Sequence, residues 1–184
     1  MPESPRGAKR RIGVTIKTHL LLSALVGFSL YETVMPIPPT LPIVTAYTLG
    51  IFLGTILPDI DEPNSYVGKR SFFVSDIFST FVRHRGVTHF LFAPVVIWWV
   101  GTMLENYLLE LLFKSIALGW LSHLLGDLLV GNGVKGFLFP IYSGRITFYP
   151  KMNFVVVGGL FEFVLQILFS VLLIIVCIDK LATI

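Results

Sequence analysis

The chain has 184 residues, of which 54% are hydrophobic and only 14% carry a charge. Soluble domains have about a quarter charged residues, so this composition and the mean hydropathy of +0.81 indicate a membrane protein. The formal net charge of +3 is too small to indicate a nucleic-acid partner. Cys177 is the only cysteine, which excludes an intrachain disulfide and a cysteine-based zinc site.

Five apolar runs reach or approach the length of about 17–25 residues that a transmembrane helix needs. They cover residues 16–35, 41–57, 87–104, 108–130 and 154–178. The segment MPIPPTLP at residues 35–42 separates the first two runs, because a helix does not continue through so many prolines. The first run follows a basic N-terminus, but the sequence SLYETVMP after it lacks a small-residue cleavage pattern, which predicts a retained helix.

The basic residues predict the orientation. Of the 14 lysines and arginines, all but Lys114 and Lys180 lie before or at the very start of the first run, after the second or after the fourth. By the positive-inside rule, this distribution predicts a multi-pass protein of the inner (cytoplasmic) membrane with a cytoplasmic N-terminus.

The segment SFFVSDIFSTFVR after the second run has helical periodicity. Its residues Phe73, Ile77, Phe78 and Phe81 share one face, and polar residues share the other. This pattern is typical of a helix on the membrane surface, or of one packed over the bundle. The predicted fold class is therefore all-α: an integral membrane bundle of about five transmembrane helices plus one interfacial amphipathic helix. Residues 1–15 form a basic cytoplasmic tail, and residues 16–184 form one membrane-embedded domain.

Histidines and aspartates share one level of this predicted bundle. The pattern LGTILPDIDEPNS puts two carboxylates at the end of the second run, and HRGVTH precedes the third. In the fourth run, a histidine and an aspartate lie one helical turn apart. We therefore expect seven side chains to converge near the cytoplasmic face: His19, Asp59, Asp61, His84, His89, His123 and Asp127. Glu162 is expected about two turns into the fifth run from the same side.

Neutral imidazoles and carboxylates are ligands for zinc, manganese or ferrous iron. Seven candidates exceed the four ligands of one tetrahedral zinc, which favours two or more divalent ions. Each pair alone has a simpler interpretation: His123 and Asp127 as a hydrogen-bonded pair between helices, Asp59 and Asp61 as a capped turn. Their common level favours a metal site, because the external half of the bundle holds no histidine.

The motifs LGTILPDIDEPNS, HRGVTH and GWLSHLLGDLL, in this order, resemble the YdjM-like membrane-bound, metal-dependent hydrolases, some of which are LexA-regulated. The segments THLLL with His19 and GNGVKGFLFPIYSGR fit the same family, and the resemblance covers residues 18 to 165. Glu62 is a departure, since the family commonly has histidine there. The family is distantly similar to zinc-dependent phospholipase C and P1 nuclease, which implies phosphoester hydrolysis and assigns His123 and Asp127 to the shared His-x3-Asp helix.

These expectations define a membrane-bound hydrolase of a phospholipid-like phosphoester, active at the cytoplasmic face. Its catalytic residues are predicted to be Asp59, Asp61 and Glu162, with Glu162 either a ligand or an orienter of a histidine. Substrate phosphate is assigned to Arg70, Arg85 or Arg145, whose guanidinium groups offer a planar fork of donors. The bland interpretation of these arginines is the positive-inside rule alone.

Two other functions are weighed. A non-catalytic metal-binding or transport protein is disfavoured, because no repeat pair and no polar outer half provide a path. A metal-free lipid phosphatase with a phosphohistidine intermediate also uses His-x3-Asp. That class further needs Pro-Ser-Gly-His and Lys-x6-Arg-Pro segments, and neither occurs in this sequence.

Overall fold

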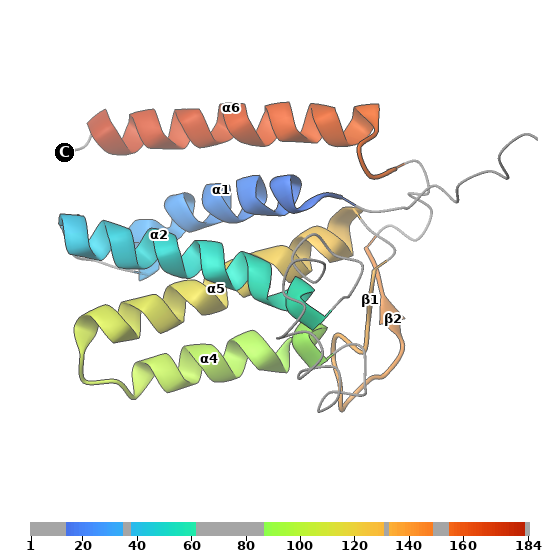
Figure 1. Ribbon diagram of the computed structural model, residues 1–184, viewed down its shortest axis with the longest axis horizontal. Coiled ribbons are helices and arrows are strands. Elements are labelled where there is room, and N and C mark those ends of the chain that lie inside the picture. Colours follow the sequence, from blue (N-terminus) through green and yellow to red (C-terminus); the bar gives the residue numbers. More distant parts are fainter. Residues whose placement is uncertain (1–13, 35–37, 62–86, 131–132, 149–154, 183–184) are drawn as a thin grey trace, which may run out of the picture.

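A computed structural model describes residues 14–34, 38–61, 87–130, 133–148 and 155–182. These residues form a bundle of α-helices that lie side by side, with a short β-hairpin at one end (Figure 1). The elements are α1 (Ile16–Val34), α2 (Leu41–Ile56), the 3-10 helices η1 (Leu57–Asp61) and η2 (Val87–His89), α4 (Phe92–Thr102), α5 (Tyr107–Val130), β1 (Val134–Lys135), β2 (Arg145–Ile146) and α6 (Leu160–Ala182). The predicted all-α membrane bundle is confirmed. The predicted amphipathic helix and almost all of the basic tail lie outside the described residues.

Three helical segments of the described chain are long and apolar enough to cross a membrane: Leu41–Ile60, Tyr107–Leu129 and Leu160–Lys180. Helix α1 has 19 residues but also carries Lys17, His19 and Glu32. Helix α4 has only 11 residues, about 16 Å of helix, and by itself is shorter than a hydrocarbon core of about 30 Å. The sequence predicted a longer helix there, but the start of that run forms η2 instead.

Close packing of α2 on α5 forms the centre of the bundle. A Cβ atom on Gly54 would lie 2.0 Å from the backbone oxygen of Ile116, and one on Gly119 would lie 2.3 Å from that of Ile51. Glycines at such positions let two helix backbones approach, as in membrane helix pairs with small residues four apart. Beside this contact, Tyr47 is buried and donates a hydrogen bond of 2.7 Å to the backbone oxygen of Gly27 on α1.

Helix α6 packs mainly on α1 and leaves most of its surface outside the bundle (Figure 1). Only 6% of its most apolar 18-residue stretch is buried, so nearly all of this apolar surface lies on the outside of the bundle. The prediction that this helix begins near residue 154 was wrong, because Gly158 adopts a φ of +73° and the helix starts at Leu160. Glu162 consequently lies in the first turn of α6, not two turns inside it.

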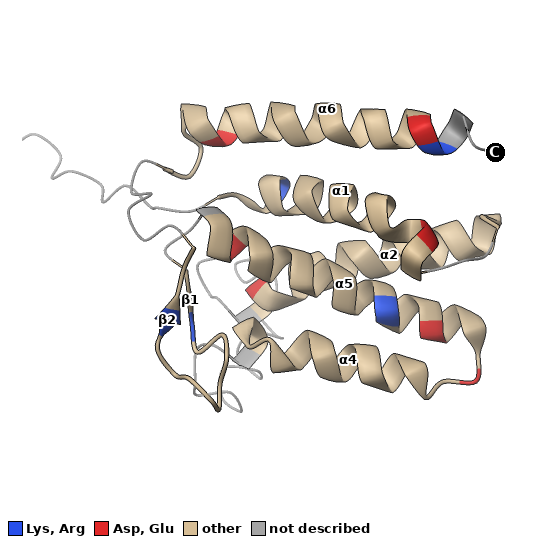
Figure 2. Cartoon of the chain, turned by 180° about the vertical axis from the view of Figure 1, so that it is seen from behind, with Lys and Arg blue, Asp and Glu red and all other residues tan. Residues whose placement is uncertain are grey.

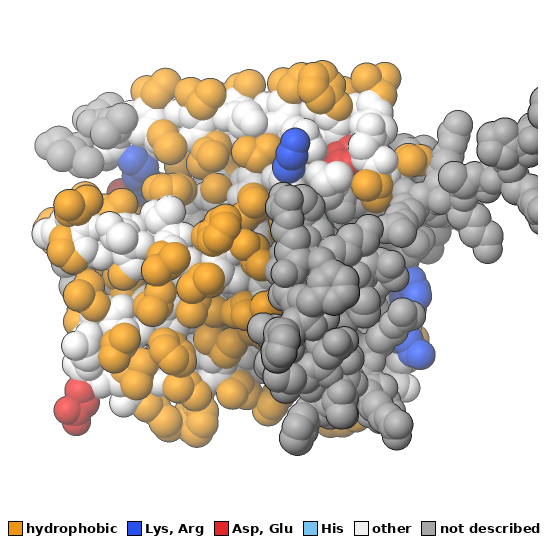
Figure 3. All heavy atoms as spheres, viewed as in Figure 1, with side chains coloured by type: hydrophobic (Ala, Val, Ile, Leu, Met, Phe, Trp, Pro, Cys, Tyr) orange, Lys and Arg blue, Asp and Glu red, His pale blue; other side chains and the backbone are white. Residues whose placement is uncertain are grey.

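One end of the bundle gathers the starts of α1, α4 and α6, the ends of α2 and α5, and the hairpin (Figure 1). Figure 2 shows that most of the charged residues on the helices lie toward the helix ends, and Figure 3 shows hydrophobic side chains over the outer faces of the helices. The alternation of helix directions thus brings sequence-distant polar residues to one level, as the sequence predicted.

Candidate metal centre

Five of the predicted ligands are described, and they come from four separate elements. His19 lies in the first turn of α1, Asp59 in η1 and His89 at the end of η2, while His123 and Asp127 lie one turn apart on α5. All four elements meet at the hairpin end of the bundle.

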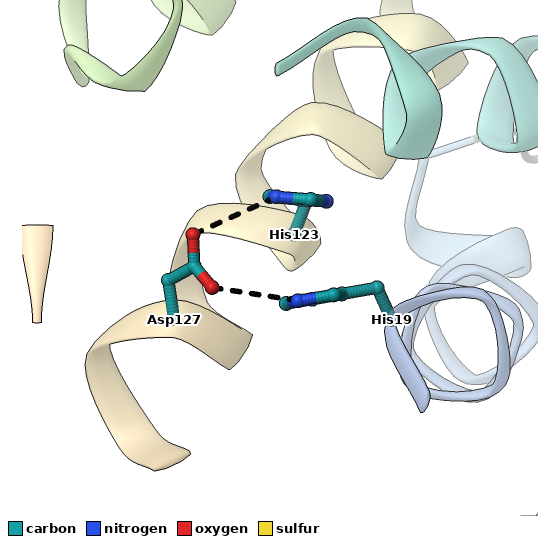
Figure 4. Close-up of side chains that lie close together, drawn as sticks. All are labelled: His19, His123 and Asp127. Carbon is teal, nitrogen blue, oxygen red and sulfur yellow. Dashed lines mark ion pairs between the residues drawn. The ribbon is translucent and has the colours of Figure 1, made fainter. Parts of the chain in front are cut away.

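Asp127 is the carboxylate that three imidazoles share. Its Oδ1 lies 3.4 Å from Nε2 of His19, and its Oδ2 lies 3.6 Å from Nε2 of both His89 and His123. Figure 4 shows the carboxylate of Asp127 between the imidazoles of His19 and His123. These distances exceed those of normal charge-assisted hydrogen bonds, which are about 2.7–2.9 Å.

His123 connects this group to a second carboxylate. Its Nε2 lies 3.8 Å from Oδ1 of Asp59, and its ring stacks on that of His19 with centroids 4.0 Å apart. The ring of His89 meets it edge-on at 5.9 Å. Two groups therefore offer ligand atoms within 4.8 Å of one another: His19, His123 and Asp127, and Asp59, His89 and His123.

Burial separates an inner part of the cluster from an outer part. His19 and His123 are buried, whereas the side chains of Asp59, His89 and Asp127 are 22–28% exposed. The cluster thus opens toward the end of the bundle. A catalytic metal site keeps such an open position, whereas a structural site is closed by its ligands.

A glycine on α5 makes room for His19. A Cβ atom on Gly126 would lie 2.8 Å from Nδ1 and 3.0 Å from Cε1 of the His19 ring. Any larger residue at this position would push the imidazole off α5. Sequence reasoning missed this role, although the glycine lies between His123 and Asp127 in GWLSHLLGDLL.

Trp120 and Thr88 hold η2, the short helix that ends at His89, in place. The indole Nε1 of Trp120 donates a 2.6 Å hydrogen bond to the backbone oxygen of Thr88, which fixes η2 against α5. The Thr88 hydroxyl lies 3.1 Å from Nδ1 of His89. Such a partner orients a ligating imidazole so that its other nitrogen faces the ion. Neither residue was singled out from the sequence.

The donor set fits a divalent metal ion. Zinc–nitrogen and zinc–oxygen bonds of about 2.0–2.1 Å at tetrahedral angles put ligand atoms about 3.4 Å apart. The measured nitrogen–oxygen separations of 3.4–3.8 Å are close to that value. Within the described part of the chain, Nδ1 of His19 and both ring nitrogens of His123 are buried without a hydrogen-bond partner. A buried polar atom without a partner costs free energy, and a bound cation would satisfy those that face the carboxylates.

Glu162 belongs to a different arrangement. Its Oε1 accepts hydrogen bonds from the backbone N–H of Thr15 (2.5 Å) and the hydroxyl of Thr18 (2.6 Å), and its Oε2 accepts one from the N–H of Gly158 (2.6 Å). Gln166 donates to the Thr18 hydroxyl at 3.0 Å. This buried carboxylate ties the start of α6 to the start of α1. The groups of possible metal ligands in the described chain do not include it.

The other predicted site residues are not brought into the cluster by any described contact. Asp61 ends η1, but its side chain is not among those described. His84, Arg70 and Arg85 lie outside the described residues. Arg145 is exposed on β2.

A family model described as "YdjM inner membrane protein" matches residues 14–182. Among curated proteins, the chain is similar to the inner membrane proteins YdjM of Escherichia coli (strain K12) and of Shigella flexneri, each 34% identical over 91 residues. The aligned segment is 45% of this chain and 43% of each relative, so the match spans less than half of their length. No solved structure matches the chain. The names of the family and of these relatives give a location and no activity.

Proposed function

The chain belongs to the YdjM family of inner membrane proteins, and we propose that it is a metal-dependent hydrolase of an amphipathic phosphoester, such as a phospholipid. One observation carries the proposal: three imidazoles and two carboxylates from four elements form two overlapping groups of ligand atoms that share His123, whose buried Nε2 faces two carboxylates without a hydrogen-bond partner among the described residues. A structural polar layer would satisfy that nitrogen within the protein.

His19 and His123 would hold the ion from the buried side of the cluster, and Asp59, His89 and Asp127 from the more exposed side. Zinc and manganese both suit this set of imidazoles and carboxylates. A bound ion would supply an activated water by lowering its pKa toward neutrality. Asp61 and His84 remain proposed ligands, and they would complete the set for a second ion.

The protein groups position the reacting species. Asp59 is 23% exposed and adjoins the open side of the cluster. Its carboxylate would orient a water molecule there or accept a proton from it. The buried pair His19 and His123 lies behind it and excludes water from the inner side. Arg70 and Arg85 remain proposed to hold substrate phosphate, and Arg145 is exposed on β2.

A membrane location brings the substrate to the site. The cluster lies at the level where the spanning helices α2 and α5 end, so an amphipathic phosphoester would reach it from the bilayer surface. We propose that this end faces the cytoplasm, because Lys17, Lys135 and Arg145 lie there and most other basic residues precede α1 or follow α2 or α5 in the sequence.

Metal transport is the second candidate function. Against it, α2 and α5, which both end at the level of the cluster, pack with close backbone approaches at Gly54 and Gly119. Beyond the cluster, Tyr47, Leu111 and Leu118 are buried between them. This packing favours a site used from one side only.

The test is elemental analysis of detergent-purified protein beside His123→Ala and Asp127→Ala. We expect zinc or manganese in the unmodified protein and its loss in both variants, with Leu129→Ala, on an exposed part of α5, as a control that keeps the metal. Hydrolysis of phosphoester lipids is then measured with the same samples. Metal retained in both variants would contradict the site, and metal without any hydrolysis would favour the binding or transport function.

A further inference from the structure

The β-hairpin lies across the end of the bundle at which α1, α4 and α6 begin, and its tip is beside the start of α4 (Figure 1). Strands β1 and β2 are antiparallel, and the backbone N–H of Gly136 donates to the oxygen of Gly144 at 2.9 Å. The N–H of Leu91 donates to the oxygen of Phe137 at 2.9 Å, and the rings of Phe90 and Phe139 stack with centroids 5.0 Å apart. The hairpin is thus fixed to the segment that enters α4.

The tip of this hairpin is apolar but not buried. Leu138, Phe139, Ile141 and Tyr142 are all exposed, and Ile141 is 91% exposed. Exposure of this apolar surface to water is unfavourable, and exposed apolar patches often mark a contact with a membrane or a partner. It adjoins the exposed face of α4, whose first residue, Phe92, is 65% exposed. The apolar surface of α4 therefore continues onto the tip at the start of this helix.

Two cations lie on the strands behind the apolar tip. The Cα atoms of Lys135 and Arg145 are directly opposed in the register of β1 and β2, and both residues are exposed. An apolar tip with cations behind it is the arrangement of elements that lie in a membrane interface.

We propose that residues 134–146 form an interfacial anchor that binds anionic phospholipid. Leu138, Phe139, Ile141 and Tyr142 enter the boundary between headgroups and acyl chains, and Lys135 and Arg145 contact the headgroup phosphate. In this proposal Arg145 contacts the headgroup phosphate of a bound lipid and does not contact the substrate. It does not depend on the metal centre, since none of these residues belongs to it.

The depth of the tip is measured with spin labels on the full chain in lipid nanodiscs, in a Cys177→Ser background. A label at Ile141→Cys should be more accessible to oxygen than to a water-soluble nickel complex, like a label at the exposed α4 residue Val95. A label at Glu105→Cys, in the exposed loop between α4 and α5, should show the reverse. A water-like value at Ile141 would overturn the anchor.

The lipid preference is measured by native mass spectrometry after extraction from bilayers of equal phosphatidylglycerol and phosphatidylcholine. Lys135→Gln and Arg145→Gln should each reduce the retained phosphatidylglycerol about fivefold, the usual effect of one basic side chain at an anionic surface. Lys135→Arg should restore it. Lys17→Gln, which removes an exposed cation from α1, is the matched control and should have little effect. If Lys17→Gln lost as much phosphatidylglycerol as the hairpin variants, the lipid site at Lys135 and Arg145 would be wrong. It would also be wrong if Arg145→Gln reduced hydrolysis while its lipid retention stayed unchanged.

Discussion

The replacement Gly126→Ala tests how the cluster is positioned without removing any ligand. The added methyl group would lie 2.8 Å from Nδ1 of His19, where ordinary contact begins at about 3.4 Å. The imidazole would therefore have to retreat by about 0.6 Å from α5. The other obstacles are the ring of His123, stacked at 4.0 Å on the same imidazole, and Asp127, whose Oδ1 lies 3.4 Å from its Nε2.

The size of the effect follows from the tolerance of metal coordination. Ligand distances in protein metal sites vary by about 0.2 Å, so a displacement three times larger removes His19 from productive geometry. We expect metal affinity to fall about 10- to 100-fold, as it does when a group that orients a ligand is lost. Helix stability should not fall for intrinsic reasons, because alanine favours a helix over glycine by about 1 kcal/mol.

The assay is titration of zinc into metal-free protein, with cobalt absorption as a second signal from the ligand set. A double-mutant cycle supplies the control: in a His19→Ala background there is no ring to displace, so Gly126→Ala should leave the residual affinity unchanged. Zinc affinity equal to that of the unmodified protein in Gly126→Ala would refute the geometry. An equal loss in both backgrounds would assign the effect to α5 rather than to His19.

Four further outcomes are expected. Glu162→Gln should lower the free energy of unfolding in detergent by about 1–3 kcal/mol, because the donors to this buried carboxylate lose their charged acceptor. The bound metal should stay in place. Chemical unfolding measures the stability, and elemental analysis measures the metal. In a Cys177→Ser background, Ser143→Cys should react with an impermeant reagent only from the cytoplasmic side, and Glu105→Cys only from outside; the reverse pattern would invert the topology. Gly54→Ala should prevent assembly of α2 on α5, since its Cβ would lie 2.0 Å from a backbone oxygen, and size-exclusion chromatography detects this. Zinc at 100 times its dissociation constant should stabilise the protein by about 2.7 kcal/mol, and an equal shift in His123→Ala would contradict a site on that residue.

Hydropathy correctly predicted those helices in which the α-helix and the apolar run begin and end at nearly the same residues. Helices α2 and α5 begin and end within one residue of the predicted ranges, because prolines precede α2 and polar residues bound α5. It failed at Val155–Val157 and around His89, where apolar residues form turns. In those segments Gly158 and the hydrogen bonds of Thr88 decide the backbone, and an average of side-chain hydropathy contains neither.

The level of the site residues was predictable, but the direction of their side chains was not. Alternating helices put His19, His89, His123, Asp59 and Asp127 at one end, and the structure brings them together. Glu162 lies at the same end, yet its carboxylate faces Thr15 and Thr18, residues 147 and 144 positions away. Helical periodicity gives no information about which neighbouring helix a side chain meets. The stacking of His19 on His123 depends in the same way on a third residue, Gly126.

The cluster is costly to the fold unless something binds it. His19 and His123 are stacked and buried, and three of their nitrogens lack hydrogen-bond partners in the described chain. Desolvated polar atoms of this kind destabilise a protein by about 1–3 kcal/mol each, whereas the backbone contacts at Gly54 and the hydrogen bonds to Glu162 stabilise the bundle elsewhere. A polar layer kept only for packing would be more stable with apolar side chains of similar volume. Since its members come from four elements that meet only when the bundle has formed, an ion bound there would stabilise the assembled state selectively. Metal binding at His123 and its neighbours would thus couple assembly of the bundle to the ion that the proposed reaction requires.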